Sequence, residues 1–223
     1  MSNSDGLPHD ASSAGTLFVV SAPSGAGKTS LVRQLVARVP NIQVSVSHTT
    51  RARRPKEIEG EDYHFVDTAK FEQLLAAGEM LEHAQVFDHY YGTSRTGVLK
   101  QLDAGVDVVL EIDWQGAQQI RQRFPACVSL EVFPPSLETL DKRLRERAQD
   151  SEETIARRMR DAVEEMSHFR EYDFLIINDD FETALADLIT IVNAERLRLP
   201  QQAARHQHRI DALLAKLDST SPP

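Results

Sequence analysis

The stretch SAPSGAGKTS at positions 21–30 constrains the fold of this chain more than any other. An apolar run, TLFVVS (16–21), precedes it, and a sequence of helical periodicity, TSLVRQLVARV (29–39), follows it. The stretch fits the pattern G-x-x-x-x-G-K-[ST] of phosphate-binding loops, except that Ala22 stands in place of the first glycine. The sequence therefore predicts a buried strand, a phosphate-binding loop and a helix, in that order.

The loop has the chemistry that a bound nucleotide requires. Backbone N–H groups and the positive end of a helix converge there, and Gly25 and Gly27 let the backbone curl around an anion. Lys28 reaches the terminal phosphates, and the Thr29 hydroxyl binds the magnesium that bridges them. The alanine at the first glycine position is harmless if its φ is negative, and the proline after it favours that conformation. We therefore expect a working nucleotide site.

Short apolar runs alternate with helical patterns along the rest of the chain. This alternation is typical of an α/β fold with a parallel sheet flanked by helices. The apolar runs predict buried strands at 106–113, 127–133 and 173–178, and the helical patterns lie at 115–124 and 183–199. We therefore expect one α/β core that begins with the strand before the loop.

Two polar, charge-rich segments interrupt the alternation, at about 46–94 and about 134–169. The first contains strand-like pieces and a short helix with Thr68 as its expected N-cap, and the second predicts two helices. We interpret both segments as lobes that are inserted into one domain and close over ligands. The expected organisation is a loose tail (1–15) and a single domain (16–223) whose core comprises 16–45, 95–133 and 170–223.

The charge balance excludes some classes of partner. The chain has 25 Lys and Arg residues against 34 Asp and Glu residues, a net charge of -9, which disfavours a long nucleic acid. No apolar run approaches the roughly 20 residues of a membrane-spanning helix, and the polar first residues lack the apolar region of a signal peptide. We expect a cytoplasmic protein without a nucleic-acid or membrane partner.

The first polar segment carries side chains suited to a phosphate acceptor. Arg51 and Arg54 lie close together, and Tyr63 follows after a turn-rich stretch. A guanidinium group grips a phosphate monoester through two hydrogen bonds, and a tyrosine hydroxyl donates another. Each arginine by itself is typical of a solvated surface, but the three side chains together indicate a phosphate site.

Two carboxylates indicate which acceptor is bound. Glu82 lies in a short apolar run, and Asp113 stands at the carboxyl end of the predicted strand 106–113, where open α/β sheets bind ligands. An ionised carboxylate only accepts hydrogen bonds, so it selects a base edge that donates them, as the N1–H and exocyclic amine of guanine do. A structural role in an ion pair or a helix cap stays open for both residues.

From about Thr16 to Leu199 the sequence resembles the bacterial guanylate kinases. The motifs that carry the resemblance are, in order, APSGAGKTSL, SHTTRARRPKEIEGEDYHF, LEHAQVFDHYYGTSR, DVVLEIDWQGAQQIR, FPPSLETLDKRLRERAQDSEE and IINDDFETAL. The resemblance implies a P-loop kinase core with a GMP-binding lobe (46–94) and a helical lid (134–169). It also implies direct, in-line transfer of the γ-phosphoryl group from ATP to GMP with Mg²⁺, a reaction of purine nucleotide metabolism.

Matched position by position, the resemblance assigns a role to each candidate residue. It places ATP on Ser21, Ala22, Pro23, Ser24, Gly25, Ala26, Gly27, Lys28, Thr29 and Asn178, with Mg²⁺ on Thr29. It places the GMP phosphate on Arg51, Arg54, Tyr63 and Tyr91, and the guanine on Ser47, Glu82, Thr93 and Asp113. It assigns the stabilisation of the transferring phosphoryl group to Lys28, Arg143, Arg147 and Arg158.

The sequence leaves two other functions open. Guanylate kinase-like domains also serve as noncatalytic scaffolds for phosphorylated peptides, but such scaffolds usually lack the complete loop that this chain retains. The second alternative is a related P-loop kinase that acts on a sugar phosphate. The pair of carboxylates Glu82 and Asp113 argues against this alternative, because it favours a base. The C-terminal segment RHQHRIDALLAKL has helical apolar spacing that suits packing either on the core or on another subunit of a homo-oligomer.

Overall fold

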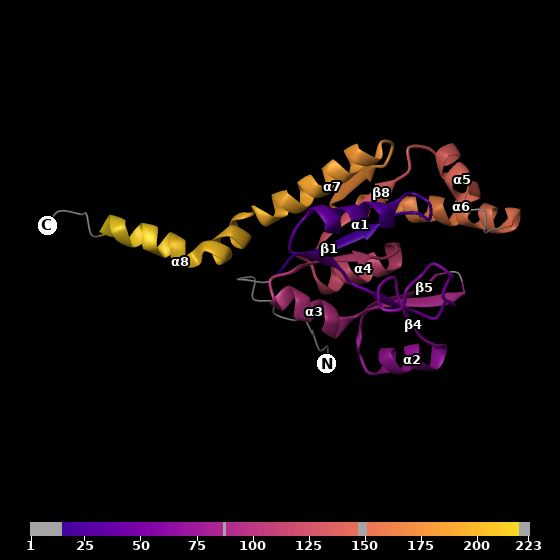
Figure 1. Ribbon diagram of the computed structural model, residues 1–223, viewed down its shortest axis with the longest axis horizontal. Coiled ribbons are helices and arrows are strands. Elements are labelled where there is room, and N and C mark those ends of the chain that lie inside the picture. The colour runs from indigo at the N-terminus through magenta and orange to yellow at the C-terminus, as the bar shows by residue number, and fades with distance from the viewer. Residues whose placement is uncertain (1–14, 87, 147–150, 219–223) are drawn as a thin grey trace.

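The computed structural model of the chain describes residues 15–86, 88–146 and 151–218. Of the tail expected at 1–15, all but Gly15 lies outside the described residues. Strands and helices form an α/β core, with a second, smaller sheet beside it and a pair of helices at one end (Figure 1). The fold class expected from the sequence is therefore confirmed.

The central sheet has five parallel strands in the order β2-β7-β1-β8-β9. They comprise β1 (Leu17–Ser21), β2 (Ile42–Val44), β7 (Asp107–Glu111), β8 (Val128–Phe133) and β9 (Phe174–Ile177). The strand β1 lies in the middle of the sheet and pairs with β7 on one side and with β8 on the other. Open α/β sheets bind ligands in the crevice at the carboxyl ends of strands arranged in this way.

Helices cover both faces of the central sheet. One face carries α1 (Lys28–Arg38) and α7 (Phe181–Arg196), and the other carries α3 (Arg95–Asp103) and α4 (Trp114–Arg123). In β1, Val20 packs among residues of α1 and α7, whereas Val19 packs among residues of α3 and α4. Both faces of the strand are thus buried, which explains why it reads as an unbroken apolar run.

A second sheet of four strands, in the order β4-β3-β6-β5, occupies the first polar segment. Its elements are β3 (Ser47–Thr49), β4 (His64–Phe65), α2 (Thr68–Ala76), β5 (Met80–Val86) and β6 (His89–Ser94). β6 pairs antiparallel with both β3 and β5, so that Thr93 lies between Ser47 and Glu82. The expectation that Thr68 caps α2 is wrong, because the preceding Asp67 is the N-cap and accepts the Lys70 N–H.

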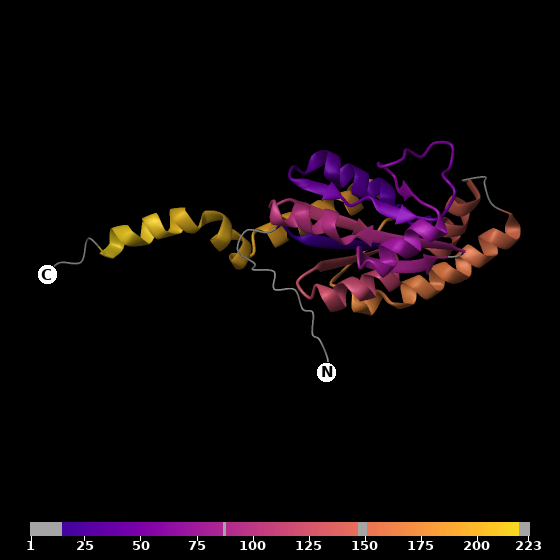
Figure 2. The ribbon, with the colours of Figure 1, turned by 90° about the horizontal axis from the view of Figure 1, so that it is seen from below.

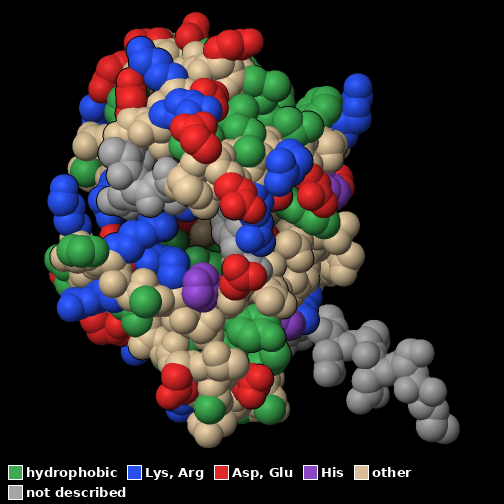
Figure 3. All heavy atoms as spheres, turned by 90° about the vertical axis from the view of Figure 1, so that its right-hand side faces the viewer, with side chains coloured by type: hydrophobic (Ala, Val, Ile, Leu, Met, Phe, Trp, Pro, Cys, Tyr) green, Lys and Arg blue, Asp and Glu red, His purple; other side chains and the backbone are tan. Residues whose placement is uncertain are grey.

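The second polar segment forms two helices, α5 (Leu137–Glu146) and α6 (Glu152–Ser167), followed by the short turn η1 (Phe169–Glu171). α5 and α6 pack on each other through a small apolar cluster that includes Leu140 and Ile155. They lie at the end of the molecule that Figure 3 faces, where Lys and Arg side chains gather beside a hollow. We refer to residues 134–169 below as the lid segment.

The C-terminal helix α8 (Leu199–Asp218) projects away from the rest of the molecule (Figures 1 and 2). Its backbone is kinked at His206, and it contacts α7 at its start. The side chains of Leu199, Leu213 and Leu214 are largely exposed. The structure therefore does not place α8 on the core, one of the two positions that its apolar spacing suits. None of the described helices is both long and apolar enough to cross a membrane.

Candidate active site

The loop between β1 and α1 has the backbone of a phosphate-binding loop. Gly25 and Gly27 each have a φ of 100°, a conformation that L side chains rarely adopt. Ala22 does not share it, since among the described residues Asn41 is the one non-glycine residue with a positive φ. The alanine therefore costs the loop little, as expected. Gly27 is the N-cap of α1 and offers no capping side chain, so no cap side chain takes up the first N–H groups of α1, an arrangement that suits a bound anion.

Lys28 and Thr29, the first residues of α1, reach the end of the neighbouring strand β7. The Lys28 ammonium donates to the Ile112 carbonyl at 3.0 Å, and the Thr29 hydroxyl donates to Glu111 Oε2 at 2.9 Å. A hydroxyl beside a carboxylate gives two oxygen atoms of the kind that bind Mg²⁺. The sequence did not predict this place for Glu111. Its one signal was a carboxylate near the end of the strand that precedes Asp113.

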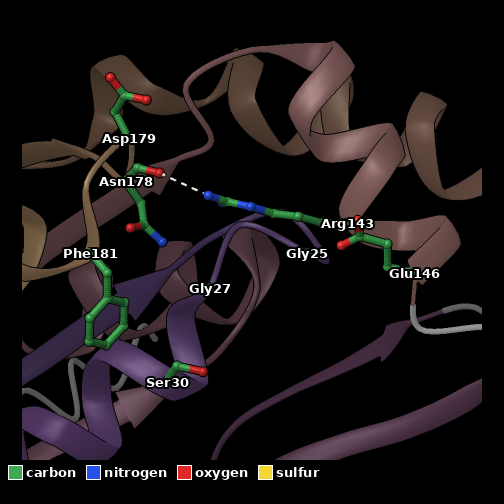
Figure 4. Close-up of a pocket in the computed structure, with 8 residues that line it drawn as sticks. All are labelled: Gly25, Gly27, Ser30, Arg143, Glu146, Asn178, Asp179 and Phe181. Carbon is green, nitrogen blue, oxygen red and sulfur yellow. Dashed lines mark hydrogen bonds between the residues drawn. The ribbon is translucent and has the colours of Figure 1, made fainter.

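A cavity of 380 Å³ lies beside the loop. It is lined by Gly25, Gly27, Ser30, Arg143, Glu146, Asn178, Asp179 and Phe181 (Figure 4). Asn178, which the resemblance places at the donor adenine, stands in the cavity wall and donates from Nδ2 to the Ala26 carbonyl at 2.6 Å. The cavity has the size of a small-molecule pocket and touches the loop, so it is the candidate site of the donor nucleotide.

Two of the three lid arginines assigned from the sequence lie among the described residues. Arg143 of α5 reaches across the loop and donates long hydrogen bonds to the carbonyls of Ala26, at 3.5 Å, and Asn178, at 3.3 Å (Figure 4). Arg158 is half-buried on α6, and Arg147 lies outside the described residues. The structure thus brings Arg143 from the lid segment to the donor loop.

The four residues expected at the GMP phosphate gather around the second sheet. The Arg51 guanidinium lies 5.5 Å from the centre of the Tyr63 ring, and the rings of Tyr63 and Tyr91 are 5.9 Å apart. Glu57, which the sequence did not single out, accepts from the Arg51 guanidinium at 2.7 Å and from the Arg54 N–H at 2.8 Å. Burial raises the pKa of Tyr63 to about 12, so its hydroxyl keeps a proton to donate.

The residues that are expected to bind guanine lie around Glu82, whose side chain is buried and 2% exposed. The Thr93 hydroxyl donates to Glu82 Oε1 at 2.6 Å, and Ser47 Oγ lies 3.3 Å from Thr93 Oγ1. Burial raises the pKa of Glu82 to about 7, and the neighbouring Asp113 carboxyl adds to the rise. Asp113 also caps α4, since it accepts the Gly116 N–H at 3.0 Å. The sequence left open whether Asp113 forms an ion pair or a helix cap, and Asp113 is the N-cap of α4.

Comparisons with known proteins identify the family. The family model described as guanylate kinase matches residues 14–195. The guanylate kinase of Chromohalobacter salexigens is 58% identical over 95% of this chain and 99% of its own length. That of Escherichia coli strain K12 is 58% identical over 91% of this chain and 97% of its own length. The chain belongs to the guanylate kinase family.

A solved guanylate kinase has the same fold. The crystal structure of the guanylate kinase from Anaplasma phagocytophilum superposes with a TM-score of 0.71 at 37% sequence identity, covering 85% of this chain and 90% of that one. The P-loop kinase fold and the resemblance seen in the sequence are therefore confirmed. The family also defines the enzyme class of the chain, which is that of an ATP:GMP phosphotransferase.

Proposed function

We propose that this chain transfers the γ-phosphoryl group of ATP directly to GMP, giving ADP and GDP, in the crevice between the donor loop and the second sheet. One observation carries this arrangement. The Lys28 ammonium donates to the Ile112 carbonyl at 3.0 Å, and Ile112 directly precedes Asp113, so the donor loop adjoins the strand end that carries the expected guanine site. Two nucleotides bound on these two sides would meet at Lys28.

On the donor side, we assign the phosphates of ATP to the backbone N–H groups of residues 21–29 and to Lys28. The adenine end would lie in the cavity beside Asn178. When bound, Mg²⁺ supplies positive charge between the phosphates, and the Thr29 and Glu111 oxygen atoms fit it because they meet at the foot of the loop. The Lys28 ammonium, which donates to the Ile112 carbonyl, exchanges that partner for a phosphate oxygen.

On the acceptor side, we assign the GMP phosphate to Arg51, Arg54, Tyr63 and Tyr91. The guanidinium N–H groups and the phenol O–H groups donate hydrogen bonds, which suits the accepting oxygens of a phosphate monoester. We assign the guanine to Ser47, Glu82, Thr93 and Asp113. In this assignment the ionised Glu82 carboxylate accepts hydrogen bonds from the donating edge of the base, whereas adenine presents an acceptor at N1.

Phosphoryl transfer needs positioning and charge neutralisation more than acid–base chemistry. We therefore assign Lys28 and the lid arginines Arg143, Arg147 and Arg158 to the charge that develops on the transferring group. The lid segment and the GMP-binding lobe (46–94) would close over the nucleotides and exclude water, which competes with GMP as acceptor. The contact of Arg143 with the loop supports this assignment, because it already links the lid segment to the donor site.

We further propose that the enzyme works in the cytoplasm, in purine nucleotide metabolism, without a nucleic-acid or membrane partner. The net charge of -9 supports the absence of a nucleic-acid partner. The projecting helix α8 supports a homo-oligomer in which it contacts another subunit. A noncatalytic scaffold agrees less well with the complete donor loop than a kinase does. A sugar-phosphate kinase agrees less well with the buried Glu82 carboxylate, which suits a base.

A coupled assay tests the reaction. With ATP and GMP the chain should form ADP and GDP in equal amounts, and no ADP should appear when GMP is left out. ADP that forms at the same rate without GMP would show water to be the acceptor and contradict the proposal.

A further inference from the structure

One face of the core helix α4 is bonded to β5, the strand that carries Glu82, and the two elements lie side by side (Figure 1). β5 is an edge strand of the second sheet, so the backbone groups on its outer side need partners other than a strand. Gln119 of α4 provides them for His83: its Oε1 accepts the His83 N–H at 3.2 Å, and its Nε2 donates to the His83 carbonyl at 2.6 Å. The Arg123 guanidinium donates to the Leu81 carbonyl. The backbone on both sides of Glu82 is therefore fixed to α4.

The Glu82 side chain also lies directly against α4. A Cβ added to the buried Gly116 would lie 3.3 Å from the Ile112 Cβ and 2.6 Å from Glu82 Oε2, and the second distance is closer than a methyl group and an oxygen atom can approach. The backbone of Gly116 is helical and its φ is not positive, so the close approach of Glu82, and not a special backbone conformation, requires a glycine here. The other oxygen, Oε1, accepts from Thr93 of β6. The carboxylate is thus confined between β6 and α4.

Helix α4 holds the second carboxylate as well. Asp113 is its N-cap and accepts the Gly116 N–H at 3.0 Å, so the residue that lies against Glu82 also anchors Asp113. Gly116, Gln119 and Arg123 are spaced three and four residues apart, which places them on one face of the helix. A single helix therefore relates a carboxylate of the core to a carboxylate of the GMP-binding lobe.

We propose that Gly116, Gln119 and Arg123 are positioning residues for base selection: they hold the Glu82 carboxylate at a set distance from Asp113. The N1–H and the amine of guanine are fixed by its rigid ring, so two acceptors bind both donors only where their separation matches. The attachment to α4 keeps this separation while the rest of the GMP-binding lobe closes. The inference rests on the proposed binding of guanine by Glu82 and Asp113.

Gly116→Ala tests the contact between α4 and the carboxylate. The methyl group should displace Glu82 Oε2, and it therefore acts by moving a charge. The KM for GMP should rise by about tenfold or more, as expected of a misplaced binding group, while the KM for ATP stays at the wild-type value. The matched control is Gly97→Ala. Gly97 likewise donates its N–H to the N-cap of its helix, α3, but a Cβ there would lie 3.7 Å from the nearest atom, Ser94 Oγ, so this variant should match the wild type.

Gln119→Leu tests the attachment of β5 to α4. Leucine fills a similar space but makes neither hydrogen bond to His83, so the KM for GMP should rise by about fivefold or more while the KM for ATP stays unchanged. The matched control is Gln118→Leu, which changes an exposed glutamine next to Gln119 on the same helix and should match the wild type.

Double-mutant cycles decide whether these effects act through Glu82. Gly116→Ala and Gln119→Leu are each combined, in the full-length chain, with Glu82→Ala, which removes the carboxylate. Because the two residues act by placing that carboxylate, neither change should raise the KM for GMP further once it is gone. Thermal unfolding shows whether each variant is folded, and where Gly116→Ala does not fold, Gln119→Leu decides.

Three results would overturn the inference: effects as large in the Glu82→Ala background as in the wild type, an equal rise in the KM for ATP and for GMP, or a wild-type KM for GMP in both Gly116→Ala and Gln119→Leu. A wild-type KM for GMP in Glu82→Ala alone would instead contradict the proposed guanine site and, with it, the inference.

Discussion

The donor and acceptor halves of the site are built in different ways. The donor half is mainly backbone, a contiguous loop in which Gly25 and Gly27 have a φ of 100° and a helix presents its N–H groups. The acceptor half consists of side chains that hold one another, as Thr93 holds Glu82. Apart from the charge of Lys28, on which the transfer step depends, steric changes should therefore disrupt nucleotide binding in the donor half. Changes of charge, including those made by pH, should disrupt it in the acceptor half.

The largest effect is expected from Lys28→Met, which removes the one side-chain cation of the loop at 21–30 without changing its backbone. The kcat should fall by about 10³-fold or more, by analogy with other phosphoryl-transfer cations, while thermal unfolding stays at the wild-type temperature. The matched control is Lys100→Met, which changes an exposed lysine on α3 and should keep full activity. A Lys28→Met enzyme with near wild-type kcat would show that the loop works by backbone alone.

Gly27→Ala tests the steric character of the donor half. The added Cβ would lie 2.4 Å from Asn178 Nδ2 in addition to the strain of the positive φ. The KM for ATP should rise about tenfold or more, which corresponds to the 1–2 kcal/mol of a left-handed residue and the displaced loop. The KM for GMP should change little.

Gly78→Ala separates strain from collision. Gly78 also has a positive φ, of 70°, but a Cβ there would meet nothing within 4 Å. Gly78→Ala should lose about as much free energy of folding as an alanine at the positive φ of Gly27 does. It should keep the wild-type KM for ATP. If both alanine variants have the same KM for ATP, the close approach of Asn178 to the loop plays no part in donor binding.

The pH dependence of GMP binding tests the charge character of the acceptor half. Because the pKa of Glu82 is raised to about 7, its carboxyl group is largely protonated below that pH and presents an O–H donor to the donating edge of the base in place of one acceptor. The KM for GMP should fall several-fold as the pH rises through this region, and Glu82→Gln should remove the dependence. The KM for ATP, measured in parallel, gives the comparison with the donor half. A KM for GMP that is flat in the wild type would remove the ionisation of Glu82 from base binding.

The smallest effect is expected from Glu57→Gln, which weakens the ion pair with Arg51 without removing a proposed GMP contact. The amide oxygen of the glutamine can still accept from the Arg51 guanidinium, so the KM for GMP should rise by about fivefold at most, which corresponds to about 1 kcal/mol. Glu61→Gln, an exposed neighbour, should behave as the wild type. A loss as large as that of Lys28→Met would mean that Glu57 touches the reacting groups.

The same difference explains what the sequence predicts well. The donor loop is local, so its glycines, Lys28 and Thr29 are legible in ten consecutive residues. The strands that flank it are apolar on both faces and are found within a few residues of their predicted ends. The sequence predicts the wrong N-cap for α2, Thr68 in place of Asp67, because both residue types suit an N-cap and the pattern alone does not choose between two adjacent ones.

What the sequence does not predict depends on strand order. Glu111 meets Thr29 because β7 pairs with β1, and Glu131 lies beside Ser21 because β8 pairs with the other side of β1. Neither pairing has a local signal. In the second sheet, Ser47 and Glu82 come together only because β6 lies between their strands, and that register is likewise set by the fold.

The selectivity for the base tests the account most directly. We would measure kcat/KM with ATP for GMP, AMP and UMP, in the wild type and in Glu82→Gln. A site built to hydrogen-bond one base should favour GMP by about 10³-fold or more, and the loss of the Glu82 charge should narrow that ratio. Equal use of AMP or UMP by the wild type, or an unchanged ratio in Glu82→Gln, would contradict the account.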